Sequence, residues 1–117
     1  MRHQKKRLKL NRLQGNKTSL FRNLAASVIL YEKVQTTKTR AKRVTPLIEK
    51  LILIAKKDNS MNAIRKLSAI LYDKNASKKL MEKLREKYKD RNSGFTRITA
   101  IKNRAGDNAS QVQIELI

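Results

Sequence analysis

The 117-residue chain contains no cysteine, and its only histidine is His3. Without cysteine there is no disulfide framework and no thiolate metal site, and one histidine cannot complete a His/Cys metal site. Three glycines are too few for a glycine-rich phosphate loop, and neither the P-loop pattern nor the dinucleotide-binding pattern occurs. The sequence therefore predicts that the protein holds no metal ion and no cofactor.

Carboxylates are also scarce. There are nine, and the first along the chain is Glu32. Glu82 and Glu86 share a helix face, but lysines and arginines flank them, so ion pairing suits them better than acid–base catalysis. With no convergent group of titratable side chains in the pattern, we predict no catalytic residues and a function other than enzymatic.

Long apolar runs are missing as well. No stretch approaches the length of a membrane span, and the beginning lacks the apolar core of a secretory signal peptide. We therefore expect a cytoplasmic protein with no membrane partner. A membrane-surface role is the rival hypothesis, since residues 18–32 suit an amphipathic helix with a basic face, but the core needs its apolar residues.

Positive charge is what the chain has in excess. Its 29 lysines and arginines against nine acids give a formal net charge of +20, and residues 1–43 hold 13 of those bases and one acid. Such a chain repels itself and usually lies beside a polyanion. The asymmetry predicts a basic N-terminal arm, residues 1–17, that is disordered when free, followed by a single globular domain, residues 18–117.

Helical periodicity dominates the first half of that domain. Apolar spacing predicts a helix over 18–32 with Thr18 or Ser19 as its cap, and a short β-branched stretch predicts a strand over 33–36. A long helix capped by Thr39 follows. Pro46 either kinks it or begins its regular part, and we favour the kinked continuous helix.

Two more helices and a hairpin complete the pattern. After Ser60, a helix carries Met61, Ile64, Leu67 and Leu71, and the next places Leu80, Leu84 and Tyr88 on one side. Both are expected at the surface of the domain, with this one narrow apolar face inward. Alternation in FTRITAI puts Ile98 and Ala100 on one face and Ile101 on the other, and QVQIELI alternates as a half-buried strand. The turn formers in RAGDNA join the two strands. The predicted fold is α+β, a two-layer helix and sheet domain in the order α-β-α-α-α-β-β.

Three segments carry residues suited to RNA. The first is the arm, where Asn11 and Asn16 interleave with cations, a mixture that suits phosphate and sugar contacts. A merely solubilising tail is the alternative, but so dense a run of one sign favours RNA. The arm's cations are Arg2, Lys5, Lys6, Arg7, Lys9, Arg12 and Lys17.

The second segment, QTTKTRAKR, stands at the entry of the long helix. Free N–H groups and partial positive charge at a helix start attract phosphate, and hydroxyls and cations surround this one. Ordinary threonine capping is the alternative, and both can hold. The residues concerned are Thr36, Thr37, Lys38, Thr39, Arg40, Lys42 and Arg43.

The third segment is DRNSGFTR, where Arg91 and Arg97 bracket Phe95. A phenyl ring beside arginine can stack on an unpaired base, yet the body has few aromatics with which to fill its core. We favour a core position for Phe95 and backbone contacts for the two arginines.

In this order, MRH, LNR, LFRNLAASVI, TTKTRAKR, LIEKLILIAKK, RNSGFTRI, RAGDNA and IEL resemble the bacterial large-subunit ribosomal proteins numbered seventeen, over essentially the whole chain. The resemblance implies an α/β structural constituent of the ribosome that supports translation. It implies binding to large-subunit ribosomal RNA near the polypeptide exit tunnel, beside other ribosomal proteins, with no small-molecule substrate and no homo-oligomer. RNA contacts are then expected at Arg2, His3, Lys5, Lys6, Arg7, Lys9, Asn11, Arg12, Lys17, Arg22, Thr36, Thr37, Lys38, Arg40, Lys42, Arg43, Arg91, Arg97 and Arg104.

A DNA-compacting protein is the other rival, since charge alone permits it. The sequence shows no recognition helix with helix-turn-helix spacing and no evident dimer face. Retention on salt-washed ribosomal particles, against enrichment in nucleoid preparations, distinguishes the two.

Overall fold

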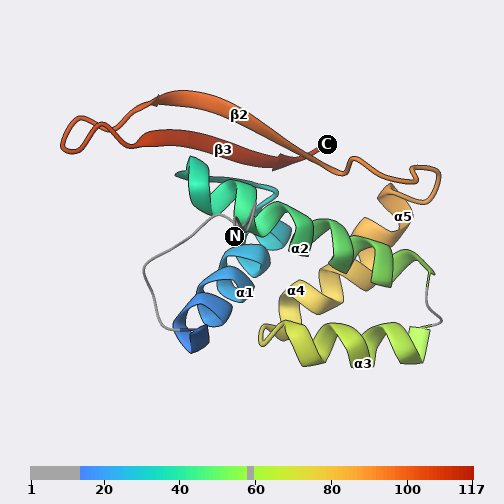
Figure 1. The fold of residues 1–117 in the computed structure, drawn as a ribbon. Helices are drawn as coiled ribbons and strands as arrows, with labels where there is room; N and C mark the ends of the chain where they lie inside the picture. The colour runs from blue at the N-terminus through green and yellow to red at the C-terminus, as the bar shows by residue number, and fades with distance from the viewer. Residues whose placement is uncertain (1–13, 58–59) are drawn as a thin grey trace, which may run out of the picture.

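The computed structural model describes residues 14–57 and 60–117 and shows an α+β fold with a three-stranded sheet above the helices (Figure 1). The predicted class and element order are both confirmed. In chain order the elements are α1 (Gln14–Tyr31), β1 (Lys33–Thr37), α2 (Lys38–Lys57), α3 (Ser60–Ile70), α4 (Lys74–Lys79), the π-helical turn η1 (Leu80–Leu84), α5 (Arg85–Lys87), β2 (Thr96–Asn103) and β3 (Ser110–Leu116).

The central strand of the sheet is β3, which pairs antiparallel with β1 on one side and β2 on the other. Val112, Ile114 and Leu116 are buried, while the residues between them are half-buried. This is the half-buried alternation expected of a strand with one face on the core, and the prediction for β3 is confirmed.

The β2–β3 hairpin extends past the beginning of α2 (Figure 1), so much of β2 has no helix beneath it. Ile98 pairs with Ile114 and Ala100 with Val112. Ile98 and Ala100 therefore share one face of the strand, as the alternation predicted. A bulge between Ala100 and Lys102 then inserts Ile101 as an extra residue. Ile101 lines the same groove as Ile98, and its predicted place on the opposite face of the strand stays a prediction.

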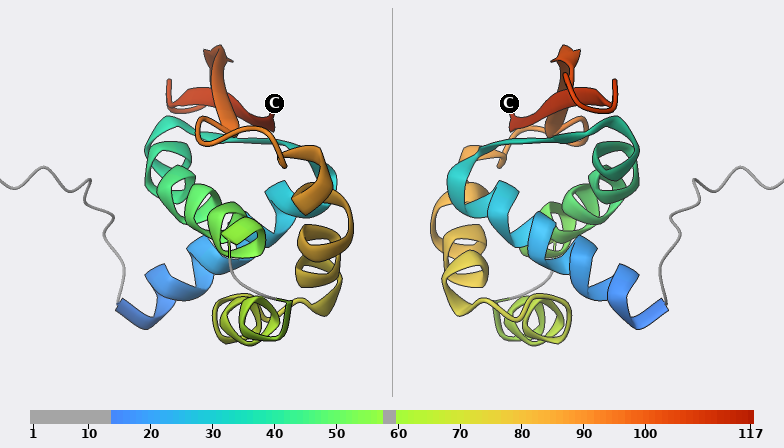
Figure 2. Two further views of the ribbon diagram at one scale, coloured as in Figure 1. Left: turned by 90° about the vertical axis from the view of Figure 1, so that its right-hand side faces the viewer. Right: turned by 90° about the vertical axis from the view of Figure 1, so that its left-hand side faces the viewer.

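Helices α1 and α2 together contribute about half of the buried hydrophobic residues of the core. Figure 2 shows α2 on one side, α4 to α5 on the other, α1 crossing between them, and α3 farthest from the sheet. Fully buried residues of the two helices include Ala25, Val28, Ile29, Ala41, Val44, Ile48, Leu51 and Ile52. The buried apolar residues of α1 therefore pack in the protein interior and are not available to a membrane surface.

Both helices begin before the predicted caps. Helix α1 starts at Gln14 and α2 at Lys38, so Thr18, Ser19 and Thr39 lie inside helices. Cap preference is a local tendency, and packing of the whole helix outweighs it. Continuity of α2 through Pro46 is confirmed. Immediately before Pro46, the Thr45 hydroxyl donates to the carbonyl of Ala41, one turn earlier, at 2.7 Å.

Helix α3 buries Ala63 and Leu67, and Leu71 just after it is also buried. Met61 and Ile64 are 64% and 50% exposed, so the predicted inward position of these two residues is wrong. Residues 63, 67 and 71 are spaced four apart and already make one helix face. Because that face meets the core, the neighbouring apolar residues are turned toward solvent.

The predicted fourth helix is one helical run with a π-helical turn inside it. Asp73 caps its start by accepting from the Asn75 N–H at 2.8 Å. Leu80, Leu84 and Tyr88 are buried as predicted, and the Tyr88 ring meets the Phe95 ring edge-on at 5.0 Å between centroids. Phe95 is fully buried, which confirms its core position.

The arm lies outside the described residues up to residue 13. Helix α1 begins within the predicted arm, at residue 14. The division of the chain into an arm, residues 1–17, and a domain, residues 18–117, stays a prediction.

Candidate nucleic-acid interface

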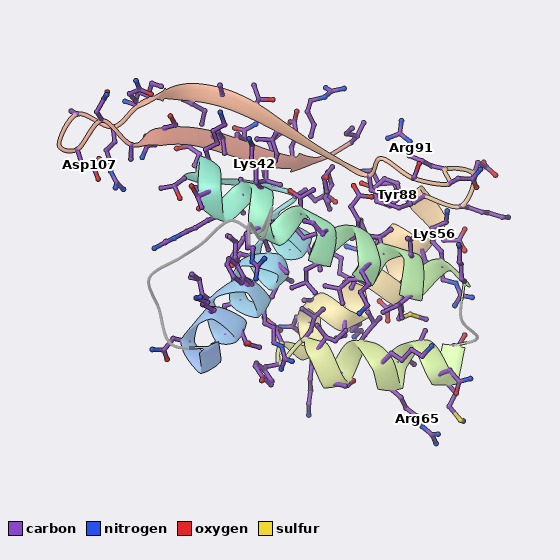
Figure 3. All side chains as sticks on the ribbon, in the orientation of Figure 1. Lys42, Lys56, Arg65, Tyr88, Arg91 and Asp107 are labelled. Carbon is purple, nitrogen blue, oxygen red and sulfur yellow. The ribbon has the colours of Figure 1, made fainter. Side chains whose placement is uncertain are left out.

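One face of α2 forms a basic ridge. Lys38, Lys42, Pro46 and Lys50 follow one another at intervals of four residues, and all four are exposed. Arg43 lies beside them and is half-buried. We call Lys38, Lys42, Arg43 and Lys50 the α2 ridge. Lys42 lies beneath the hairpin (Figure 3), so the ridge starts at the sheet and runs along the helix.

The acids nearest in sequence point away from the ridge. Glu49 is the only acid of α2, and its Oε1 accepts from the N–H groups of Phe95 and Thr96 at 3.1 and 3.2 Å. Glu32 pairs with Lys79 at 3.3 Å and with Lys87 at 4.0 Å, on the α4 to α5 side. Because both carboxylates are engaged elsewhere, the charge of the ridge is not neutralised by them.

A groove lies between the ridge and the hairpin, with a volume of about 420 Å³. Lys38 and Lys42 line it from α2, Lys102 lines it from β2, and Ile98, Ile101 and Val112 supply apolar surface. We call it the hairpin groove. Among the described residues, no acid lines it.

A second groove, of about 300 Å³, lies between α1 and α2 and is lined by Lys17, Arg22, Arg43 and Lys50. Arg43 covers the Phe21 ring at 5.7 Å from its centroid. We call it the α1 groove. The fold thus brings three predicted RNA contacts, Lys17, Arg22 and Arg43, together on one surface with Lys50.

The α1 groove continues toward an exposed aromatic ring. Arg22 donates to the Tyr72 hydroxyl at 2.6 Å and lies 5.3 Å from the centre of that ring. Tyr72 is 67% exposed. Arginine and an accessible aromatic ring are both groups on which unpaired bases stack.

The remaining residues of the QTTKTRAKR segment lie apart from the ridge. Thr36 pairs with Val112 and shares the sheet face that meets the helices, whereas Thr37 pairs with Gln111 on the other face. Arg40 is half-buried. Thr36, Thr37 and Arg40 line neither the hairpin groove nor the α1 groove.

The arginines around the hairpin are each engaged within the protein. Arg97 lies 3.8 Å from Glu115 across the sheet, and Arg91 donates to the Gly94 carbonyl at 3.2 Å. Arg104 grips Asp107 with two hydrogen bonds, of 2.9 and 2.5 Å. That pairing, with the Ala109 N–H, lowers the pKa of Asp107 to about 2.

Other predicted contacts fall outside the described residues: Arg2, His3, Lys5, Lys6, Arg7, Lys9, Asn11 and Arg12. They stay predictions. Base stacking by Phe95 is excluded, since the ring is fully buried and Lys56 lies 5.2 Å from its centroid.

Sequence reasoning missed Lys50 and the hairpin groove. Lys50 stands eight residues after Lys42, a helical spacing that could have joined it to the ridge. Nothing in the sequence indicated the groove, because its walls come from α2 and a bulged strand far along the chain.

Within the part of the chain that the structure describes, no helix is long and apolar enough to cross a membrane. The same residues contain no cluster of three or more histidine or acid side chains suited to a metal ion.

Comparison with known proteins agrees with the sequence resemblance. The family model for ribosomal protein L17 matches residues 20–117. The large ribosomal subunit protein bL17 of Solibacter usitatus is 43% identical over all 117 residues, which cover 77% of that protein. Its counterpart in Campylobacter concisus is 41% identical, with 98% of it covered. This chain belongs to the ribosomal protein L17 family, whose members are structural constituents of the ribosome.

Proposed function

We propose that the chain is a component of the large subunit of cytoplasmic ribosomes and binds large-subunit ribosomal RNA. The α2 ridge and the two grooves beside it form the RNA-facing surface of the domain, and the arm adds further contacts. One observation carries the proposal. The four cations of the α2 ridge line two grooves, and no described acid lines either groove. The nearest acids in sequence, Glu49 and Glu32, are engaged elsewhere.

The ridge suits the RNA backbone better than base edges. Lysine ammonium groups are compact point charges that bind phosphate without demanding one geometry. Each phosphate that they neutralise releases condensed counterions, so binding weakens as salt increases. Specificity then comes from how well the shape of the folded RNA matches the surface formed by the ridge and the two grooves.

Salt dependence tests the ridge directly. Full-length chain is titrated with large-subunit ribosomal RNA over a range of salt concentrations, and Lys42→Ala is compared with Arg65→Ala. Both substitutions remove one positive charge, and Arg65 lies on α3, away from the sheet (Figure 3). We expect Lys42→Ala to weaken binding and to reduce the salt slope by about one, and Arg65→Ala to change both less.

Equal losses for the two variants would show that only net charge matters, and would contradict a defined RNA-facing surface. Equal affinity of the wild type for double-stranded DNA and ribosomal RNA of the same length would instead favour the DNA-compacting rival.

We further propose that the chain lies on the solvent side near the polypeptide exit tunnel, beside other large-subunit proteins. The basis is membership of the family. Tyr31 is 74% exposed and stands at the C-terminal end of α1. Lys17, which lines the basic α1 groove, stands near the other end of the same helix. A photoreactive group at position 31 should therefore crosslink to neighbouring proteins of the subunit. Crosslinking only to proteins remote from the exit would contradict this location.

A further inference from the structure

The hairpin groove exposes apolar surface where a ribosomal RNA-binding protein needs polar surface. Ile98 and Ile101 are 36% and 42% exposed, and both line it. The sheet packs on α1 and α2. The hairpin passes beyond the start of α2 (Figure 1), and the two isoleucines line the groove between it and that helix. Exposed apolar surface in a concave, rimmed site marks a place where something binds.

Charge decides what class of occupant fits. Lys38, Lys42 and Lys102 line the groove, and no described acid does. An acidic rim would be needed to attract a basic neighbour, and the described lining offers none. Three ammonium groups around an apolar floor instead suit a ligand with an anionic edge and a flat, weakly polar body.

Hydrogen-bonding groups complete the lining. Asn103 and Gln111, a cross-strand neighbour of Lys102, contribute side-chain amides that both donate and accept. The edges of an unpaired nucleobase present the same mixture of donors and acceptors. The volume, about 420 Å³, lies within the range of about 300–1,000 Å³ typical of small-ligand pockets.

We propose that the hairpin groove holds one unstacked nucleotide of the ribosomal RNA, with its base against Ile98 and Ile101 and its phosphate beside Lys38 and Lys42. This inference rests on the proposed function, because it assumes that RNA lies along the α2 ridge. It goes further by assigning the hairpin a binding role that depends on apolar contact and shape. The bulge belongs to the proposed site, because Ile101 stands at it and lines the groove.

Photocrosslinking locates the occupant. The full chain with Ile101→p-benzoylphenylalanine is assembled into large subunits and irradiated, and Ile64→p-benzoylphenylalanine on α3 is the control, since Ile64 is also exposed. We expect position 101 to crosslink to one or two adjacent unpaired nucleotides that position 64 does not reach. Crosslinks from position 101 to a protein, or to RNA helices scattered through the subunit, would overturn the assignment.

Footprinting provides a second measurement that needs no bulky probe. Ile101→Ser is bound to large-subunit ribosomal RNA, and the chemical reactivity of each nucleotide is compared with that in the wild-type complex and in free RNA. We expect affinity to fall by less than about tenfold, a loss of under 1.4 kcal/mol. One nucleotide alone should regain the reactivity it has in free RNA.

An unchanged footprint for Ile101→Ser would overturn the nucleotide site while leaving the proposed function intact. Absence of any footprint for the wild-type chain at low salt would overturn the proposed function and the nucleotide site with it. Circular dichroism of the variant, matched to wild type, excludes unfolding as the cause of a changed footprint.

Discussion

The Glu49 carboxylate lies 2.9 Å from the Thr96 hydroxyl and binds α2 to the beginning of β2. The same oxygen also accepts the backbone N–H groups of Phe95 and Thr96. One acid thus joins two segments nearly fifty residues apart in sequence and covers donors at the edge of the core. It stabilises the domain, and its engagement there also leaves the α2 ridge free of acids.

Replacing Glu49 should therefore affect folding. Glu49→Ala leaves two part-buried N–H groups without their acceptor, at about 1–3 kcal/mol for each donor that stays buried. Glu49→Gln keeps an oxygen but loses the charge that strengthens such bonds, so it should cost about 1 kcal/mol. Urea unfolding measures both. The control, Glu86→Ala on the exposed surface, should stay within about 0.5 kcal/mol of wild type, and a similar loss there would contradict the role given to Glu49.

Tyr88 predicts a loss of stability at high pH. Its hydroxyl is buried and, among the described residues, has no hydrogen-bond partner. Burial, and next the charge of Glu32, raises the pKa of Tyr88 to about 12, against about 10 for an ordinary tyrosine. Between these two values the unfolded chain has lost the proton that the folded chain keeps. Stability from this group is complete below about pH 10 and falls by up to about 1.4 kcal/mol per pH unit as pH rises toward 12.

Tyr88→Phe should remove that contribution. Lysines also titrate in this range, so the informative quantity is the difference between the variant and wild type in urea unfolding from about pH 9 to pH 11. The variant should also match or exceed wild-type stability near pH 7, because it deletes an unpaired buried hydroxyl. Tyr31→Phe is the control at an exposed position. Identical pH profiles for Tyr88→Phe and wild type would refute the prediction.

Periodicity predicted the parts of the fold where neighbouring residues in sequence share one environment. Val112, Ile114 and Leu116 alternate because one face of β3 lies on the core along its whole length. Leu80 and Leu84 are four residues apart because one face of their helix lies on the core. In such cases the side-chain pattern records burial directly.

Features made by distant segments left no such record. Met61 and Ile64 fit an inward face as well as Ala63 does, and only the position of the core decides between them. Glu32 ends α1 at a φ of 64°, a left-handed conformation that glycine usually takes, so no turn residue announced the break. There the Leu116 N–H donates to the Glu32 carbonyl at 2.9 Å, a contact between the end of α1 and the end of β3.

The candidate interface divides in the same way. The basic segments were evident because charge is a property of composition, so Lys17, Arg22, Lys38, Lys42 and Arg43 could be named from the sequence. Their grouping could not, because it depends on α1 and the hairpin each packing against α2. The pairing of Arg104 with Asp107 was likewise absent from the prediction, which treated the arginine as a free RNA contact.

That pair predicts a local response to acid at the hairpin tip. Asp107 is exposed, and its pKa of about 2 comes first from the Arg104 hydrogen bond and then from the Ala109 N–H. A depressed folded pKa means that the pair stabilises the turn above the ordinary carboxyl pKa of about 3.9, and the effect is lost as pH falls through about 2. Carbon-13 NMR of the Asp107 carboxyl should show this midpoint. Arg104→Ala should raise this midpoint, because it removes the hydrogen bond to Asp107. Lys102→Ala removes a positive charge but no hydrogen bond to Asp107, so it should shift the midpoint less. A larger shift for Lys102→Ala would contradict the cause given.

Deleting residues 2–12 tests whether the arm contributes to binding independently of the domain. The deletion removes six of the chain's cations and no acid. Because the described core draws on residues from Phe21 onward, we expect the urea midpoint to remain within error of wild type. Affinity for large-subunit ribosomal RNA should fall, with a salt slope reduced by about one for each lost phosphate contact. A full-length chain in which those six cations are replaced by glutamine separates the effect of charge from that of length. An equal loss of affinity in both variants would assign the arm's role to phosphate neutralisation. Unchanged affinity in both would confine RNA binding to the domain.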